Sequence, residues 1–125
     1  MVTLDSVEWK NGDNPWQTTN FTNGSAGILN SAVNNAIKIK GTYTPSGTGK
    51  IWVIKIKIAS AGPDNIIDAA LDGSGNYTAT VASGMLANTQ YTISVHTATM
   101  KDGDDPIQNA TKPDPVTLLI GSQDP

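Results

Sequence analysis

The chain has 125 residues, 38% hydrophobic and 15% charged, with eight lysines, no arginine, eleven carboxylates and a net charge of −3. This length predicts a single domain over residues 1–125, and the lack of arginine argues against nucleic acid as a partner, because arginine binds phosphates best. The lack of cysteine excludes disulfides and thiolate chemistry, and no apolar run reaches the roughly 18 residues of a membrane span.

Apolar residues alternate with polar ones along most of the chain, which is the pattern of half-buried β-strands. The segment 65–71 is weaker and predicts either an edge strand or one helical turn. In the run 50–58, alternation places Trp52 with three isoleucines on the core side and two lysines on the other. No stretch predicts an amphipathic helix, so we expect seven strands, at residues 2–7, 36–44, 50–58, 65–71, 77–81, 91–95 and 116–120.

The segment 86–92 is the most informative stretch. Leu86 is expected to close one strand and Tyr91 to open the next across a short polar turn. A buried phenol must return its hydroxyl to a nearby backbone group, which is how a corner of a β-sandwich is built. The sequence therefore predicts a sandwich with Trp52, Leu86 and Tyr91 as structural residues.

Residues 10–35 show no periodicity and predict a long irregular loop after the first strand. The loop is either pinned over the end of the sandwich by its aromatic side chains or forms a binding surface, and such loops are usually packed by their own side chains. Residues 121–125 are interpreted as the end of a linker.

Four segments carry a resemblance to a known family: 27–32 (GILNSA), 37–42 (IKIKGT), 75–81 (GNYTATV) and 91–95 (YTISV). Together they are similar to the tandem immunoglobulin-like repeats of very large bacterial surface adhesins, including the extender regions of RTX-type and biofilm adhesins. The spacing from Leu86 to Tyr91 equally resembles fibronectin type III modules.

The resemblance implies an all-β, immunoglobulin-like or fibronectin III-like Greek-key sandwich. It also implies a secreted or cell-surface location as part of a larger bacterial protein, with neighbouring immunoglobulin-like domains as partners. The implied role is a non-catalytic extender. In such adhesins calcium commonly stiffens the joints between domains, for which Asp5, Asp72 and Asp124 are the terminal or loop carboxylates available in this chain.

The densest group of carboxylates is Asp102, Asp104 and Asp105, in the loop expected after the Tyr91 strand. Calcium favours several oxygen ligands on a flexible turn that contains glycine, so these three residues are the ligands to test for a bound calcium ion. Their spacing is not that of an EF-hand, and the alternative is a solvated turn.

Catalysis is not expected. The single histidine, His96, falls on the outer face of its strand, and no serine lies in a nucleophile motif. One alternative function is a carbohydrate- or ligand-binding module in which Trp9, Trp16 and Phe21 form an aromatic platform for a sugar ring. A decoration domain on a phage particle would use the same fold.

Overall fold

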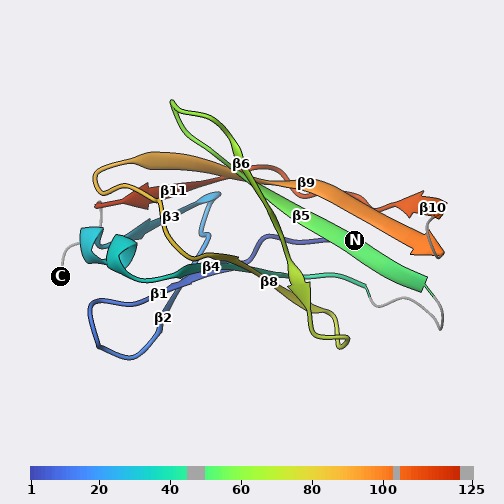
Figure 1. Cartoon of the computed structure of the whole chain (residues 1–125), viewed down its shortest axis with the longest axis horizontal. Coiled ribbons are helices and arrows are strands. Elements are labelled where there is room, and N and C mark those ends of the chain that lie inside the picture. Colours follow the sequence, from blue (N-terminus) through green and yellow to red (C-terminus); the bar gives the residue numbers. More distant parts are fainter. Residues whose placement is uncertain (45–49, 103–104, 122–125) are drawn as a thin grey trace.

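A computed structural model describes residues 1–44, 50–102 and 105–121 (Figure 1). Within these residues the chain forms eleven strands and one short 3₁₀ helix, η1. Their bounds are β1 Ser6–Trp9, β2 Gln17–Asn20, β3 Ser25–Ile28, η1 Asn30–Asn34, β4 Ile37–Thr42, β5 Lys50–Ala59, β6 Asn65–Asp68, β7 Ala70–Leu71, β8 Asn76–Val81, β9 Gln90–Asp102, β10 Asp105–Asn109 and β11 Val116–Ile120.

The strands form two sheets that pack face to face, which confirms the predicted all-β sandwich. One sheet has five strands in the order β2-β1-β4-β8-β7, and the other has the order β3-β11-β9-β5-β6, with β10 also paired to β9. Figure 1 shows them as two layers, with β9 and β11 above β1, β4 and β8. Neighbouring strands are antiparallel except for β3 and β11, which run parallel.

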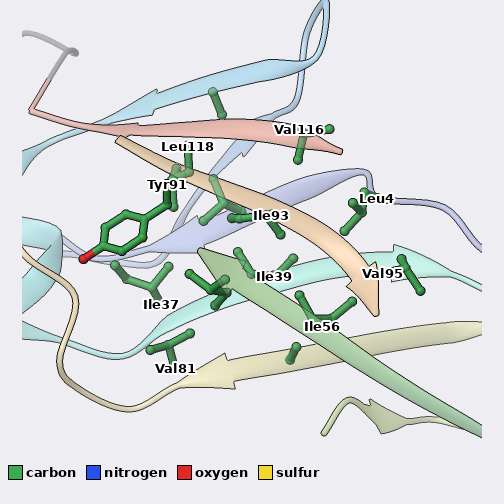
Figure 2. Packing of buried hydrophobic residues seen from close by; sticks show 14 of the residues in the cluster. Leu4, Ile37, Ile39, Ile56, Val81, Tyr91, Ile93, Val95, Val116 and Leu118 are labelled. Carbon is green, nitrogen blue, oxygen red and sulfur yellow. The ribbon is translucent and has the colours of Figure 1, made fainter. Parts of the chain in front are cut away.

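The core lies between the inner faces of the two sheets (Figure 2), and the alternation read from the sequence correctly predicts its members on β4, β5, β8 and β11 and on β9 as far as Val95. The strands β4, β5, β8, β9 and β11 bury alternate residues, because a pleated strand turns successive side chains to opposite faces. The buried set on β4, β5, β8, β9 and β11 comprises Ile37, Ile39, Trp52, Ile54, Ile56, Ile58, Tyr77, Ala79, Val81, Tyr91, Ile93, Val95, Ala98, Val116, Leu118 and Ile120.

A β-bulge interrupts the longest strand, β9. Lys55 of β5 pairs with Thr97 and the next residue, Ile56, pairs with Val95, so His96 is the extra residue on β9. The bulge resets the alternation, and Ala98 instead of Thr97 then points inward. His96 is exposed, as predicted, and its carbonyl accepts a hydrogen bond of 2.9 Å from Lys112 Nζ.

Residues 10–35 are not the irregular loop that we expected, because they contain β2, β3 and η1. The strand β2 is polar and mostly exposed at the edge of the five-stranded sheet, so it carries no alternation of apolar residues. The strand β3 has only four residues, most of them small. Short edge strands of this kind lack the periodic signal on which the prediction depended.

Two connections switch sheets and cover the open sides of the sandwich. On one side β2, an edge of the five-stranded sheet, leads directly into β3, an edge of the other sheet. On the opposite side β6 leads into β7, and between them the Ala69 N–H donates to the Ile54 carbonyl at 2.9 Å. The segment 65–71 is therefore an edge strand, as one of the two alternatives predicted, divided between both sheets.

The first strand begins later than predicted, at Ser6 instead of residue 2. Val2 forms an isolated bridge with Tyr43, and both Val2 and Leu4 are still buried. Val7 and Trp9 are also buried although they have the opposite parity, so the regular alternation of β1 starts only after Asp5.

Candidate functional site

The predicted corner is present at the start of β9. Tyr91 is 7% exposed, and its Oη accepts a hydrogen bond of 2.9 Å from the Leu86 N–H. Figure 2 shows Tyr91 at one end of the core cluster with its hydroxyl pointing away from Ile93. The role given to Leu86 is corrected, because β8 already ends at Val81 and the Leu86 side chain is 63% exposed. Leu86 contributes its backbone amide, whose bonding does not depend on the side chain.

Trp52 lies on the core side of β5, as predicted. Its side chain is buried, and its indole N–H donates to the Thr44 carbonyl at 2.8 Å. A buried indole needs such an acceptor, because its N–H would otherwise lose the hydrogen bond that it makes with water. Trp52 and Tyr91 therefore stabilise the sandwich, as predicted for structural residues.

The three aromatic residues proposed as a sugar platform do not form one surface. Trp9 is 1% exposed, and its indole N–H donates to Thr19 Oγ1 at 3.0 Å. Phe21 is partly buried against the core, and only Trp16, at 37%, is exposed. Trp9 points inward because it shares the face of Val7 on β1, so the platform prediction is wrong for Trp9 and leaves Trp16 as the exposed ring.

Trp16 lies against two lysines. Lys10 Nζ is 4.8 Å and Lys38 Nζ is 4.2 Å from the centroid of its ring, which is cation–π geometry. On the neighbouring strands, Lys40 Nζ of β4 lies 3.3 Å from Glu8 Oε1 of β1. The contacts of Lys10 and Lys38 with the Trp16 ring restrict the access of a sugar to the indole, since a stacking ligand needs a free ring face.

A polar hollow of about 370 Å³ lies on the outer face of the five-stranded sheet, and its lining includes Asp5, Ser6, Lys40, Asp72, Asn76 and Thr78. Two of the three carboxylates that the sequence assigned to a calcium joint, Asp5 and Asp72, thus come to the same hollow. The third, Asp124, lies outside the described residues.

Both carboxylates of the hollow accept hydrogen bonds from the chain itself. Asp5 Oδ2 accepts from Thr3 Oγ1 at 3.0 Å. Asp72 accepts from the backbone N–H groups of Ser74, at 2.7 Å, and Asn76, at 3.1 Å, and from the Asn76 side chain. These bonds, with that from Ser74 the strongest influence, lower the pKa of Asp72, because they favour the charged carboxylate. Asp72 thereby closes the turn between β7 and β8.

The floor of the hollow is formed by Tyr77, which packs on Gly41 and hydrogen-bonds to Thr3, a contact that the sequence alone did not predict. Tyr77 is fully buried, and its hydroxyl donates to the Thr3 carbonyl at 2.6 Å. Burial, with a smaller contribution from the charge of Asp5, raises the pKa of Tyr77. Its ring covers Gly41, the residue directly opposite on β4. An aromatic residue across from a strand glycine fills the space that the missing side chain leaves.

Two of the proposed calcium ligands lie at facing strand ends. Asp102 ends β9, Asp105 begins β10, and the two are backbone partners, so both belong to strands where a loop was expected. Asp104 and the side chains of Asp102 and Asp105 lie outside the described part of the chain, so their arrangement toward calcium stays a prediction. In the remainder that the structure describes, no three acidic or histidine side chains gather closely enough to hold a metal ion.

The fold defines the class of protein, which is an all-β protein built as a two-sheet sandwich. Comparisons of the chain with family models, with curated proteins and with solved structures gave no match. Within the described residues, no helix has the length and apolar character needed to cross a membrane.

Proposed function

We propose that this chain is a non-catalytic extender domain of a bacterial cell-surface adhesin, with immunoglobulin-like Greek-key topology and neighbouring domains of the same kind as its partners. One observation carries the proposal. The two ends of the chain are separated along the long axis of the sandwich: the end of β11 lies near one extreme, and the N-terminus lies beside β5, past the middle toward the other side (Figure 1). A domain of this form adds its length to an array.

The strand order supports the immunoglobulin-like assignment. In that fold the first, second, fifth and fourth strands form one sheet, and the third, sixth and seventh form the other. With β1, β4, β5, β7, β8, β9 and β11 taken as the seven strands, both observed orders follow this rule. The strand β6 then extends the second sheet as in variable-type domains, and Tyr91 stands at the start of the sixth strand, where a tyrosine corner belongs.

The pairing of β3 with β11 suits a domain that bears tension. The two strands are parallel over four register pairs, from Ser25 with Thr117 to Ile28 with Ile120. The two backbone bonds at the limits of this pairing are Thr117 N–H to the Gly24 carbonyl, 2.8 Å, and Gly121 N–H to the Ile28 carbonyl, 2.7 Å. Force that pulls β11 along its axis acts on all of its bonds to β3 together, instead of opening them one after another.

Small-angle X-ray scattering of two copies joined head to tail tests the extender role. We expect an elongated particle whose maximum dimension is close to twice that of one copy. A matched tandem with a long Gly/Ser linker should give a broader distribution of dimensions, because such linkers behave as random coils. A compact particle with the two copies side by side would contradict the proposal.

Calcium is the cofactor we propose for the joint. Millimolar calcium is expected to raise the melting temperature of the two-copy chain more than that of one copy, because only a ligand that prefers the joined native form shifts its equilibrium. The double variant Asp104→Asn/Asp105→Asn tests whether the acidic segment supplies the calcium ligands. The double variant Asp5→Asn/Asp72→Asn tests whether the carboxylates of the hollow supply them. Equal shifts in both chains would exclude a calcium ion at the joint.

A ligand-binding module is the second candidate, and the exposure of Trp16 on the same sheet face as the polar hollow is the observation that favours it. Binding of a glycan that is weakened by Trp16→Ala and unaffected by Leu86→Ala would support it over the extender. The phage decoration alternative predicts instead tight binding to a capsid lattice.

A further inference from the structure

The chain contains two Asn-Gly pairs, Asn11-Gly12 and Asn23-Gly24. Glycine has no Cβ, so the backbone nitrogen of the glycine can approach the side-chain amide of the preceding asparagine more closely than that of any other residue. Whether the two groups react depends on how firmly the fold holds the side chain and the peptide group between the two residues.

Asn23 and Gly24 form the two-residue turn between β2 and β3. Thr22 and Ser25 exchange two backbone hydrogen bonds of 2.9 and 3.1 Å, and the φ angles of +52° at Asn23 and +81° at Gly24 indicate a type I′ turn. The turn is exposed, and no atom of the structure lies within 4 Å of the position that a Cβ on Gly24 would take.

The peptide group that joins Asn23 to Gly24 is not held by hydrogen bonds to the described residues. Among the described residues, neither the Asn23 carbonyl, nor the Gly24 N–H, nor the Asn23 side-chain amide has a hydrogen-bond partner. The backbone bonds around the turn involve the peptide groups on either side of it, including the Gly24 carbonyl that accepts from Thr117. Rotation of the central peptide group therefore breaks none of these bonds.

Asn11 provides an internal comparison because its groups are held. Its side-chain Oδ1 accepts from Ser31 Oγ at 2.7 Å, and its carbonyl accepts from the Asn14 N–H at 3.1 Å. The Gly12 carbonyl accepts from the Asn35 side chain at 3.2 Å. The bonds to the Asn11 side chain and carbonyl have no counterpart at Asn23, whereas the Gly24 carbonyl also accepts a bond, from Thr117. Attack by the Gly12 nitrogen would therefore have to displace bonded Asn11 groups.

We propose that Asn23 is a site of spontaneous modification, at which the folded chain converts this asparagine to aspartate and isoaspartate. The Gly24 nitrogen loses its proton to solvent and attacks Cγ of Asn23. A C–N bond forms, the side-chain nitrogen leaves as ammonia, and a succinimide results. Water then opens the ring at either carbonyl. The net reaction takes up one water and releases one ammonia, with no oxidation or reduction.

The modification acts where the parallel pairing of β3 and β11 begins. Either product adds one negative charge to the net charge of −3, because a carboxylate is ionised near neutral pH. Isoaspartate also adds one carbon atom to the backbone, immediately before the Gly24 carbonyl that accepts from Thr117. It is therefore the isoaspartate product that loosens the edge strand.

Incubation of the purified full chain in warm, mildly alkaline buffer, followed by peptide mass spectrometry and an isoaspartate methylation assay, tests the proposal. In the folded chain we expect Asn23 to react about tenfold faster than Asn11, since reaction at Asn11 must first break a hydrogen bond to its side chain. In denaturant the two rates should converge. Equal rates in the folded chain, or faster reaction at Asn11, would overturn the assignment.

Two variants test the two parts of the proposal, which are the protection of Asn11 by its hydrogen bond and the loosening of the edge strand by the extra backbone carbon at position 23. Ser31→Ala frees the Asn11 side chain and should raise the rate at Asn11 several-fold without changing that at Asn23. Asn23→Asp supplies the charge without the extra backbone carbon and should leave the hydrogen exchange of the Thr117 amide unchanged, whereas the isoaspartate form should increase it. If Ser31→Ala leaves the rate at Asn11 unchanged, the protective role of its hydrogen bond is wrong.

Discussion

Replacement of Gly41 by alanine tests the close packing of Gly41, on β4, against Tyr77, on β8. A Cβ on Gly41 would lie 2.5 Å from Tyr77 Oη and 2.6 Å from Tyr77 Cε2, and it would also collide with the Thr3 carbonyl. All three atoms belong to one arrangement, since the Tyr77 hydroxyl donates to that carbonyl. Tyr77 is fully buried and cannot move aside without displacing its neighbours.

The cost of Gly41→Ala follows from three contributions. Overpacking costs about 1–3 kcal/mol, and loss of the Tyr77 hydrogen bond costs about 0.5–1.5 kcal/mol. The lower entropy of an unfolded chain with alanine returns about 0.4–1 kcal/mol. The net loss is about 0.5–4 kcal/mol, with a central value of about 2.3 kcal/mol. With an unfolding entropy of roughly 2.1 cal/mol/K per residue over this chain, the central value lowers the melting temperature by about 9 °C.

Gly62→Ala is the matched control, because nothing lies within 4 Å of its Cβ position and its φ angle is not in the left-handed region. Chemical denaturation and calorimetry of both variants measure the difference. We expect Gly62→Ala to be neutral or slightly stabilising. A Gly41→Ala protein as stable as the Gly62→Ala protein would refute the close packing of Gly41 against Tyr77.

Three further predictions concern the aromatic residues. Tyr91→Phe should lower the free energy of unfolding by about 1–3 kcal/mol, since it leaves the Leu86 N–H without its acceptor, and urea denaturation measures this loss. The unfolded chain ionises Tyr77 near pH 10.0 whereas the folded chain keeps it protonated to higher pH. The contribution of Tyr77 to stability should therefore be constant below pH 10 and then decline by up to about 1.4 kcal/mol per pH unit, and Tyr77→Phe should remove this part of the slope in denaturation curves across that range. Trp9→Ala should cost about 3–5 kcal/mol and Trp16→Ala less than about 1 kcal/mol by calorimetry, and similar losses for the two would contradict their different burial.

The sandwich and most of its core could be predicted because the alternation of apolar and polar residues in each strand indicates which of its residues are buried. Ile37 and Ile39 on β4, like Tyr91 and Ile93 on β9, alternate with polar residues whatever strand lies beside them. The His96 bulge could not be found this way, since a bulge is a property of the pairing between β5 and β9. The alternation continues past it with only a shift of phase.

The candidate surfaces depend on register and were only partly predictable. Asp5 and Asp72 share the hollow because β1 pairs with β4 and β4 with β8, and no spacing along the chain encodes those two pairings. The packing of Tyr77 on Gly41 had one signal in the sequence, which is that Gly41 lies on the apolar face of its strand. Only the register places Tyr77 opposite that glycine.

The two ends of the β3–β11 pairing differ in how firmly they are held. At the C-terminal end, Asn30 and Asn88 exchange two hydrogen bonds beside Gly121: the Asn88 N–H donates to Asn30 Oδ1 at 2.9 Å, and Asn30 Nδ2 donates to Asn88 Oδ1 at 3.1 Å. Gly121 has a φ angle of +98°, and a Cβ there would lie 2.5 Å from Asn30 Oδ1, so only glycine fits. The other end is bounded by the Asn23-Gly24 turn, whose central peptide group bonds to no described residue. We expect local opening to start at the turn, because only backbone bonds close it, whereas the side chains of Asn30 and Asn88 add bonds at the Gly121 end. Under the proposed extender role, a change at Asn23 is therefore expected to leave the C-terminal end of the domain in place.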